Sequence, residues 1–309
     1  MKISIIGSGN VGTTAAIYIT LEGLPVDVFL FDAVEGLPQG RAIDLGQAEA
    51  LKGSDVSIKG SNNYEDTAGS EIVVITAGVA RKPGMSRLDL LKKNKEIVTP
   101  VVKQVVKHSP DARLLIVTNP VDIITYLALK ISGFERKKVF GMGGVLDGAR
   151  FCYFLSRALK EQPRDIYPLI IGEHGEGMLP LTKYSTVSGK PVNEVMGKKE
   201  LNKIIDKTRN AGADIVSFLK TGSAYLAPGA AVAKMAAAII SPQAEKEILP
   251  ASVYLNGEYG LRDICLGVPV KLGRNGIEEI IELKLSNEER GVLIHTAGKL
   301  KAVIREVHL

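Results

Sequence analysis

Histidine is the side chain best suited to exchange a proton near neutral pH, and this chain has four, at positions 108, 174, 295 and 308. His174 directly follows an apolar run and has Gly172 and Gly175 close by. This setting suits an imidazole that projects from a strand end into a cleft. The other three lie at a helix end or in the terminal helix, where structural or solvent-facing positions are expected. We therefore predict that His174 is a general acid or base.

Asp147 and Arg150 are three residues apart in a helix predicted over about residues 146–160, so their side chains share one face. One interpretation is an intrahelical ion pair with no further role. In the other, Asp147 hydrogen-bonds one ring nitrogen of His174 and fixes its tautomer. Arg150 then remains free to bind a carboxylate through two parallel hydrogen bonds. The two residues alone leave both interpretations open.

Three glycines at the start of the chain predict a dinucleotide-binding βαβ unit. Gly7, Gly9 and Gly12 follow an apolar run at residues 3–6, and a second apolar run ends at Asp32, twenty residues past Gly12. Gly7 permits the tight turn, Gly9 lets the backbone approach a pyrophosphate, and Gly12 lets the helix pack on the strand. Asp32 would accept hydrogen bonds from the ribose hydroxyls and repel a 2′-phosphate. This pattern favours NAD over NADP.

Residues 78–87 join a predicted strand to a predicted helix and contain two glycines, a proline and two arginines, Arg81 and Arg87. Exposed arginines are common on protein surfaces, so both could simply be solvated. The glycines and the proline also fit a hinged lid that carries both guanidinium groups toward a ligand.

The pattern of apolar residues predicts the strands and helices that would position these side chains. Up to about residue 140, apolar runs alternate with helical patterns, which predicts a parallel sheet covered by helices. The runs at residues 3–6, 26–31, 72–76 and 114–118 are continuous, as in strands buried on both faces. Ligands of such sheets bind beyond the carboxyl ends of the strands. The segments expected around one crevice are therefore residues 7–12, 76–87 and 119–122.

Beyond residue 141 the pattern changes to an α+β arrangement. We expect a strand over residues 167–171, a long helix after Lys198, a hairpin turn at Asn256 and Gly257, and a last helix opened by a capping box of Ser286 with Glu289. The predicted fold class is α/β, a Rossmann-type doubly wound parallel sheet followed by an α+β catalytic domain. The expected domains are residues 1–141 and 142–309.

Composition excludes several classes of protein. The 309 residues are 45% hydrophobic and 24% charged, with a net charge of +5. Basic residues are scattered and tryptophan is absent, so nucleic-acid binding is not expected. The apolar stretch at residues 227–240 is broken by Lys234 and is too short to span a bilayer. Residues 1–2 run directly into the first strand, leaving no room for a signal peptide.

The chain has two cysteines, Cys152 and Cys265, which are far apart and match no metal or redox spacing. We expect both to be buried free thiols in a reducing compartment, and hence a cytoplasmic protein without a bound metal.

Six motifs in order make the chain resemble the lactate/malate dehydrogenase family, and its malate branch in particular. The resemblance covers essentially the whole chain. They are Gly-Ser-Gly-Asn-Val-Gly at 7–12, Glu-Gly-Leu-Pro-Gln-Gly at 35–40, Ala-Gly-Val-Ala-Arg-Lys-Pro-Gly-Met-Ser-Arg at 77–87, Thr-Asn-Pro-Val-Asp at 118–122, Leu-Asp-Gly-Ala-Arg at 146–150 and Gly-Glu-His-Gly at 172–175.

The resemblance implies NAD-dependent interconversion of malate and oxaloacetate, with His174 as the acid/base and Asp147 as its orienting carboxylate. It further implies four substrate contacts: Arg150 on the C1 carboxylate, Arg81 on the C4 carboxylate, and Arg87 and Asn119 near the C2 oxygen. It also implies a homodimer or homotetramer. The implied cofactor contacts are Gly7, Gly9, Asn10, Val11, Gly12, Asp32, Thr76, Ala77, Gly78, Asn94, Val117 and Asn119.

Some positions depart from the family pattern or are ambiguous. Glu173 before the histidine is found more in lactate enzymes, and Glu176 stands where aspartate is frequent, whereas Ala224 replaces a threonine common in lactate enzymes and so favours malate. A lactate or other 2-hydroxyacid dehydrogenase is therefore the nearest alternative. From other classes, the alternatives are a noncatalytic NAD-binding protein and an NAD- and metal-dependent glycosidase. The latter would need a suitably placed cysteine and histidine pair, which the sequence lacks.

Overall fold

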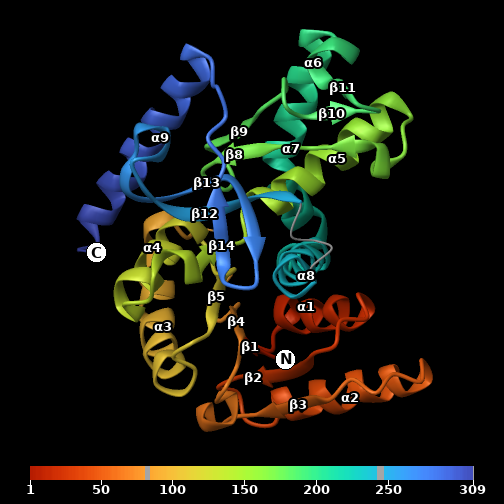
Figure 1. The fold of residues 1–309 in the computed structure, drawn as a ribbon, viewed down its shortest axis with the longest axis vertical. Helices are drawn as coiled ribbons and strands as arrows, with labels where there is room; N and C mark the ends of the chain where they lie inside the picture. The colour runs from red at the N-terminus through yellow and green to blue at the C-terminus, as the bar shows by residue number, and fades with distance from the viewer. Residues whose placement is uncertain (81–83, 242–246, 309) are drawn as a thin grey trace.

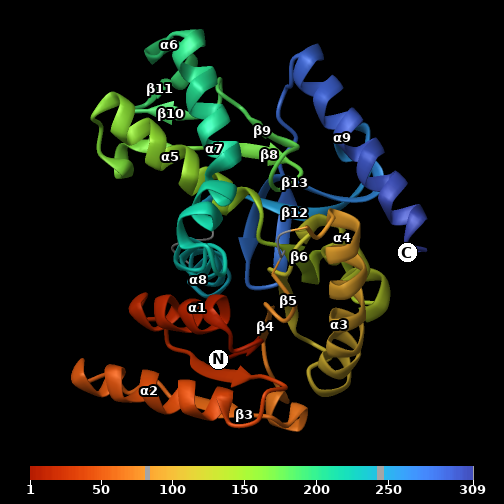
Figure 2. The same cartoon turned by 180° about the vertical axis from the view of Figure 1, so that it is seen from behind.

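The computed structural model describes residues 1–80, 84–241 and 247–308. Two parts of the chain share one sheet, which is parallel in the first part and antiparallel in the second. Figures 1 and 2 show the parallel part with α2 and α3 at the lower end of the molecule, and α5 to α7 at the opposite end.

The parallel part of the sheet has the strand order β3-β2-β1-β4-β5-β6. The order reverses at β1, which pairs in parallel with both β2 and β4. This reversal opens a crevice beyond the carboxyl ends of β1 and β4. The strands are β1 Lys2–Ile6, β2 Asp27–Phe31, β3 Ile58–Ser61, β4 Ile72–Ile75, β5 Arg113–Ile116 and β6 Val139–Gly141.

Helices connect these strands, and local signals place their ends. The N-terminus of α3 has a capping box in which Ser86 and Asp89 satisfy each other's backbone N–H groups. Its last turn carries Lys107 and His108, whose charge suits the negative end of the helix dipole. The helices are α1 Asn10–Leu21, α2 Leu37–Leu51, α3 Arg87–His108 and α4 Val121–Ser132, with short 3-10 turns η1 Tyr64–Thr67 and η2 Arg136–Lys138.

The sheet continues into the second part of the chain, because β6 pairs in parallel with β5 and antiparallel with β12. From there the order is β12-β13-β8-β9, with β14 on β13, and a separate small sheet has the order β11-β10-β7. The strands are β7 Ile166–Tyr167, β8 Ile170–Gly172, β9 Met178–Pro180, β10 Thr186–Val187, β11 Lys190–Pro191, β12 Ile248–Asn256, β13 Arg262–Gly273 and β14 Gly276–Ile280.

The remaining helices surround this extension, and α8 returns to pack against α1, as both views in Figures 1 and 2 show. α9 begins with the predicted capping box of Ser286 and Glu289. The elements are α5 Gly144–Leu159, α6 Val192–Val195, α7 Lys198–Leu219, α8 Leu226–Ile240 and α9 Asn287–Glu306, with 3-10 turns η3 Pro163–Asp165 and η5 Glu258–Gly260.

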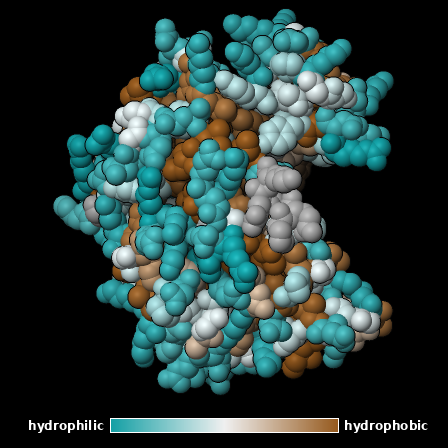
Figure 3. All heavy atoms as spheres, in the orientation of Figure 1, coloured by the Kyte–Doolittle hydropathy of each residue, from teal (hydrophilic) through white to brown (hydrophobic). Residues whose placement is uncertain are grey.

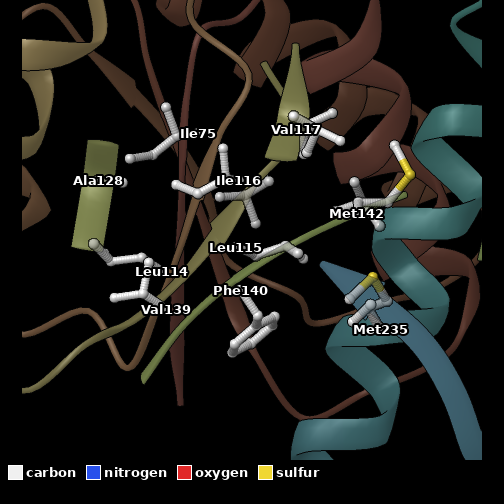
Figure 4. Packing of buried hydrophobic residues seen from close by; sticks show 14 of the residues in the cluster. Ile75, Leu114, Leu115, Ile116, Val117, Ala128, Val139, Phe140, Met142 and Met235 are labelled. Carbon is white, nitrogen blue, oxygen red and sulfur yellow. The ribbon is translucent and has the colours of Figure 1, made fainter. Parts of the chain in front are cut away.

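One hydrophobic core runs through both parts of the chain. Figure 4 shows apolar side chains of β4, β5 and β6 packed together with Met235 of α8. Phe140 is fully buried at this junction. Because cores are close-packed, the two parts are joined by contiguous packing as well as by the shared sheet. A smaller cluster lies under α5 and α7.

The structure corrects three details of the sequence-based predictions. The run at residues 167–171 is two strands, β7 and β8, of different sheets, because Pro168 lacks the N–H that a continuing ladder needs. The Asn256–Gly257 turn does join two antiparallel strands, but through the 3-10 turn η5. Cys265 is buried as expected, whereas Cys152 is only partly buried, and both are free thiols.

Within residues 1–80, 84–241 and 247–308, no helix combines the length and apolar character needed to cross a membrane.

Candidate active site

A cavity of about 1600 Å³ lies where the parallel sheet meets the second part of the chain. Most of the predicted site residues line it, although they are spread over more than 160 positions of the sequence. These residues are Gly7, Gly9, Asn10, Val11, Gly12, Asp32, Thr76, Ala77, Gly78, Arg87, Val117, Asn119, Arg150 and His174. Arg81 is outside the described residues, and Asp147 and Asn94 are behind the cavity wall.

The three glycines after β1 have different surroundings in the structure. Gly7 has a φ of +106°, and a Cβ atom on Gly12 would lie 1.9 Å from the carbonyl oxygen of Gly7. A Cβ atom on Gly9 would meet nothing within 4 Å. Gly9 is also the N-cap of α1 and provides no side-chain hydrogen bond to its first turn. The loop therefore leaves open space in front of free helix N–H groups, which is a setting for a phosphate.

Asp32 follows β2 and faces the same cavity. Its two carboxylate oxygens accept the N–H groups of Ser8 and Val34, at 2.7 and 2.9 Å. Each oxygen can accept a further hydrogen bond, so the carboxylate is held in place and can still bind ligand hydroxyls. Tyr64 stacks on Phe31 beside it, and burial together with the charge of Asp32 raises the pKa of Tyr64 to about 12.

His174, which follows β8, forms one hydrogen-bonded group with Asp147 and Arg150 of α5. The Nδ1 atom of His174 is 2.8 Å from Oδ2 of Asp147, and Nη1 of Arg150 donates to the other oxygen at 3.3 Å. The Asp147 side chain is only 2% exposed. The ion pair and the imidazole hydrogen bond therefore exist together, and the interpretation of an ion pair with no further role does not hold. With Nδ1 occupied, Nε2 is the ring nitrogen left for a ligand.

The electrostatic surroundings favour the charged form of this imidazole. Burial lowers the pKa of His174, but the charge of Asp147 and its hydrogen bond raise it, and the net shift is upward from the usual value. Arg150 opposes the rise and Asp122 adds to it. The imidazole therefore holds its proton to a higher pH than an ordinary histidine does.

Arg150 packs against α7 at a point where that helix has no side chain. A Cβ atom on Gly212 would lie 3.3 Å from Nη2 of Arg150, which is close contact. The α7 backbone therefore forms a wall of the guanidinium pocket, and Gly212 provides the room for it.

Arg87 is the first residue of α3 rather than part of the preceding loop. Its guanidinium pairs with Glu173 at 3.5 Å and with Glu176 at 2.7 Å, on either side of His174. The Arg87 side chain is 48% exposed. The two glutamates that depart from the malate pattern are thus its partners in this structure. Burial raises the pKa of Glu173, and the charge of Arg87 opposes that rise.

Asn94 differs from the expected direct cofactor contact. Its side chain is fully buried, accepts the N–H of Val79 at 2.8 Å, and donates to the carbonyl oxygen of Asn119 at 2.6 Å. Asn94 therefore ties together the two loops that follow β4 and β5, and shapes the cavity wall from behind.

Sequence reasoning missed the role of Asp122, which was expected at the crevice. It is buried at the start of α4, where it accepts the backbone N–H of His174 at 2.9 Å and the hydroxyl of Ser252 at 2.6 Å. The sequence signal that could have indicated a role for Asp122 is its position in the motif at residues 118–122. The sequence alone does not show that His174 lies against it.

His295 of α9 also borders the cavity but is exposed, which agrees with the predicted solvent-facing position. Among the described side chains, no group of three or more His, Cys, Asp or Glu residues is arranged to hold a metal ion.

Comparisons with known proteins agree with this geometry. Residues 1–141 match the lactate/malate dehydrogenase NAD binding domain, and residues 144–308 match the alpha/beta C-terminal domain of the same family. A malate dehydrogenase of Methanosarcina mazei is 48% identical over 309 residues, all of both chains.

Solved structures include the malate dehydrogenase of Cryptosporidium parvum, with a TM-score of 0.95 and 41% identity over 99% of this chain and 98% of that one. The lactate dehydrogenase of the same organism, with lactic acid and nicotinamide adenine dinucleotide, has a TM-score of 0.94 and 36% identity, with 99% and 98% covered. The chain therefore belongs to the lactate/malate dehydrogenase family.

Proposed function

We propose that this protein is an NAD-dependent malate dehydrogenase that interconverts malate and oxaloacetate. The observation that carries the proposal is the pairing of His174 with Asp147, and of Asp147 with Arg150, at the cavity that also contains the open glycine loop. The names of the relatives support malate as the substrate. Bound NAD supplies the hydride acceptor, and bound NADH the donor.

In malate oxidation, Nε2 of His174 would accept the proton of the C2 hydroxyl, and the bound cofactor would serve as the hydride acceptor. Asp147 keeps the proton of the ring on Nδ1 and stabilises the imidazolium that forms. Oxaloacetate reduction runs the same transfers in reverse, with the imidazolium as the acid.

Three cations and one amide bind the substrate in this proposal. Arg150 holds the C1 carboxylate from its pocket against α7, and Arg81, assigned from the sequence, pairs with the C4 carboxylate. Arg87 moves away from Glu173 and Glu176 to polarise the C2 oxygen, and Asn119 hydrogen-bonds near the same oxygen.

Several observations fit NAD to residues 1–141, which we propose as the cofactor domain, with residues 142–309 as the catalytic domain. Gly9 leaves open space beside the uncapped start of α1, where a diphosphate would lie. Asp32 faces the cavity and would bind the ribose hydroxyls. The remaining proposed contacts are Gly7, Asn10, Val11, Gly12, Thr76, Ala77, Gly78, Val117 and Asn119.

Replacing Asp32 with alanine is expected to weaken the use of NADH and to improve that of NADPH. Loss of charge-assisted hydrogen bonds to the ribose should lower kcat/KM for NADH by about 10- to 100-fold. Loss of the negative charge removes repulsion of the 2′-phosphate. Steady-state kinetics with both cofactors measure the change. Asp27→Ala, at the exposed start of the same strand, is the matched control. An unchanged NADH to NADPH ratio in Asp32→Ala would contradict the assignment.

The raised pKa of His174 gives the two directions opposite pH dependences. Oxidation needs the neutral imidazole and declines as the pH falls through this pKa, whereas reduction needs the imidazolium and declines as the pH rises through it. Asp147→Asn removes the charge that raises the pKa. We expect the midpoints of both kcat/KM profiles to move to lower pH, with kcat reduced. Unmoved midpoints would show that Asp147 does not set the protonation of His174.

We further propose that the protein is a cytoplasmic homodimer or homotetramer. Large apolar side chains are exposed on α1, α2, α7 and α8, and Figure 3 shows brown atoms over the region of α1 and α8. Burial of such side chains between copies would be favourable. Sedimentation is expected to give the mass of two or four chains, and a monomer at micromolar concentration would contradict this proposal. The side chains are Ile17, Leu21, Ile43, Leu51, Val216, Phe218, Leu219 and Leu226.

NADH oxidation measured with oxaloacetate and with pyruvate tests the proposed function. We expect a much higher kcat/KM with oxaloacetate, and little activity with NADPH. A preference for pyruvate would identify a lactate-type enzyme, which the ion pair of Arg87 with Glu173 and the similarity to a lactate dehydrogenase structure make the second candidate. Tight NADH binding without reduction of either acid would indicate a noncatalytic protein.

A further inference from the structure

His174 is bonded to two buried carboxylates, and only Asp147 has a role in the mechanism above. We propose that Asp122 is a positioning residue that fixes the backbone of His174, ties it to Asn119, and adds a second negative charge behind the imidazole. The proposal rests on the proposed function, because it assigns a role at the same site. It concerns a residue that does not reach the cavity and touches no substrate atom.

The backbone of His174 depends on Asp122 because the sheet has already ended there. β8 stops at Gly172, and the N–H of His174 donates to Oδ2 of Asp122 at 2.9 Å. The other oxygen of Asp122 accepts the Ser252 hydroxyl at 2.6 Å, and Ser252 belongs to β12. Asp122 is 3% exposed and Ser252 is fully buried. The carboxylate therefore joins the loop of His174 to the central sheet without competition from water.

Asp122 also belongs to the same short segment as Asn119, the other group proposed to meet the C2 oxygen. Asp122 is the second residue of α4 and follows Asn119 by three positions. The carbonyl of Asn119 is fixed from behind by the buried side chain of Asn94. On the other side, a Cβ atom on Gly143 would lie 3.4 Å from the Cβ atom of His174, so the imidazole is backed by the start of α5. Asn119 and His174 thus belong to one rigid unit.

Charged groups face the imidazole of His174 from three elements. Asp147 and Arg150 come from α5, Asp122 comes from α4, and Glu173 is its neighbour in the chain. Cys265 of β13 lies near Asp122, and its thiol pKa is raised well above normal by burial and then by the charge of Asp122. Among these groups, only Arg150 opposes protonation of the ring, so the charge of Asp122 acts in the same direction as that of Asp147.

Burial raises the pKa of Asp122 itself, and the donors from Ser252 and His174 oppose this rise. Asp122→Asn retains an oxygen to accept the His174 N–H but loses the charge, whereas Asp122→Ala loses both. The two variants therefore separate the backbone contact from the electrostatic contribution.

The imidazole pKa of His174 can be measured by NMR in histidine-labelled protein, with the signal assigned by its loss in His174→Asn. This readout does not need activity. We expect Asp122→Asn to lower the pKa of His174 by roughly 0.3 to 1 unit, with kcat within about 10-fold of the wild type. We expect Asp122→Ala to lower kcat by about 100-fold. NADH affinity should be unchanged in both.

Glu49→Gln is the matched control, because Glu49 of α2 is another buried carboxylate, bonded to Thr20 and Lys52, and the substitution should leave the pKa of His174 unchanged. An unchanged pKa in Asp122→Asn overturns the proposal whatever kcat does, since a merely structural role would give that result. A wild-type kcat in Asp122→Ala overturns it as well. If Asp122→Ala does not fold, the pKa in Asp122→Asn decides.

The proposed function and this inference fail in different ways. A wild-type protein that does not reduce oxaloacetate contradicts the proposed function, while the NMR comparison still tests the influence of Asp122 on His174. A wild-type enzyme that reduces oxaloacetate but shows no pKa change in Asp122→Asn contradicts this inference alone.

Discussion

Replacing His174 with asparagine is expected to lower kcat by about 10²- to 10⁴-fold in both directions, which is the usual contribution of a positioned acid or base. Asparagine keeps polarity and approximate size but cannot exchange a proton. Because His174 has no backbone role in the glycine loop, NADH binding measured by fluorescence should be retained. Steady-state rates with malate and with oxaloacetate give the loss.

His295→Asn is the control for this variant. His295 borders the same cavity from α9 but is exposed, and it has no assigned role. We expect near-wild-type turnover from it. Turnover close to wild type in His174→Asn, or an equal loss in His295→Asn, would overturn the assignment of the base.

Replacing Arg81 with glutamine is expected to change which acid the enzyme prefers. Loss of a charge-assisted contact with the C4 carboxylate should cost about 2–5 kcal/mol, or about 30-fold to several thousand-fold in kcat/KM for oxaloacetate. Pyruvate has no second carboxylate, and an enclosed cation without a partner is unfavourable. The rate with pyruvate should therefore rise relative to that with oxaloacetate.

The control for Arg81→Gln is Arg290→Gln, which makes the same change at an exposed position of α9 away from the cavity. Its ratio of kcat/KM values for oxaloacetate and pyruvate should equal that of the wild type. An unchanged ratio in Arg81→Gln would mean that another residue selects the substrate.

Features with local signals were predictable from the sequence. The close approach of Gly12 to the carbonyl oxygen of Gly7 lies within one βαβ unit, and the spacing of Asp147 and Arg150 follows from the period of a helix. The capping box at Ser286 is equally local. The pairing of His174 with Asp147 connects residues 27 positions apart, and here the resemblance to a family was more informative than the spacing.

Features made by distant parts of the chain were not predictable. The sheet continues from β6 to β12 through pairs such as Ser252 with Gly141. Nothing in the sequence of either segment indicates that the two strands pair. The contact of Ser252 with Asp122 spans 130 positions. Asn94 was expected at the cofactor from the family resemblance, but its amide hydrogen-bonds the loops after β4 and β5 from within the core. Register and side-chain direction at such junctions depend on tertiary packing.

The position of Arg87 could not be predicted from the sequence for a different reason. The sequence placed it on a mobile loop, whereas it begins α3 and pairs with Glu173 and Glu176. The two glutamates that depart from the malate pattern are thus the partners of Arg87 in this structure. In the proposed mechanism, a dicarboxylate would compete with them for this guanidinium.

The central claim is that an imidazole held by Asp147 meets the C2 oxygen while cations bind both ends of a C4 dicarboxylate. A crystal structure with NADH and an unreactive dicarboxylate analogue of oxaloacetate tests it most directly. We predict Nε2 of His174 within about 2.6–3.2 Å of the C2 oxygen, with one carboxylate on Arg150 and the other on Arg81. An imidazole turned away from the ligand, or a dicarboxylate bound without both arginines, would contradict the account.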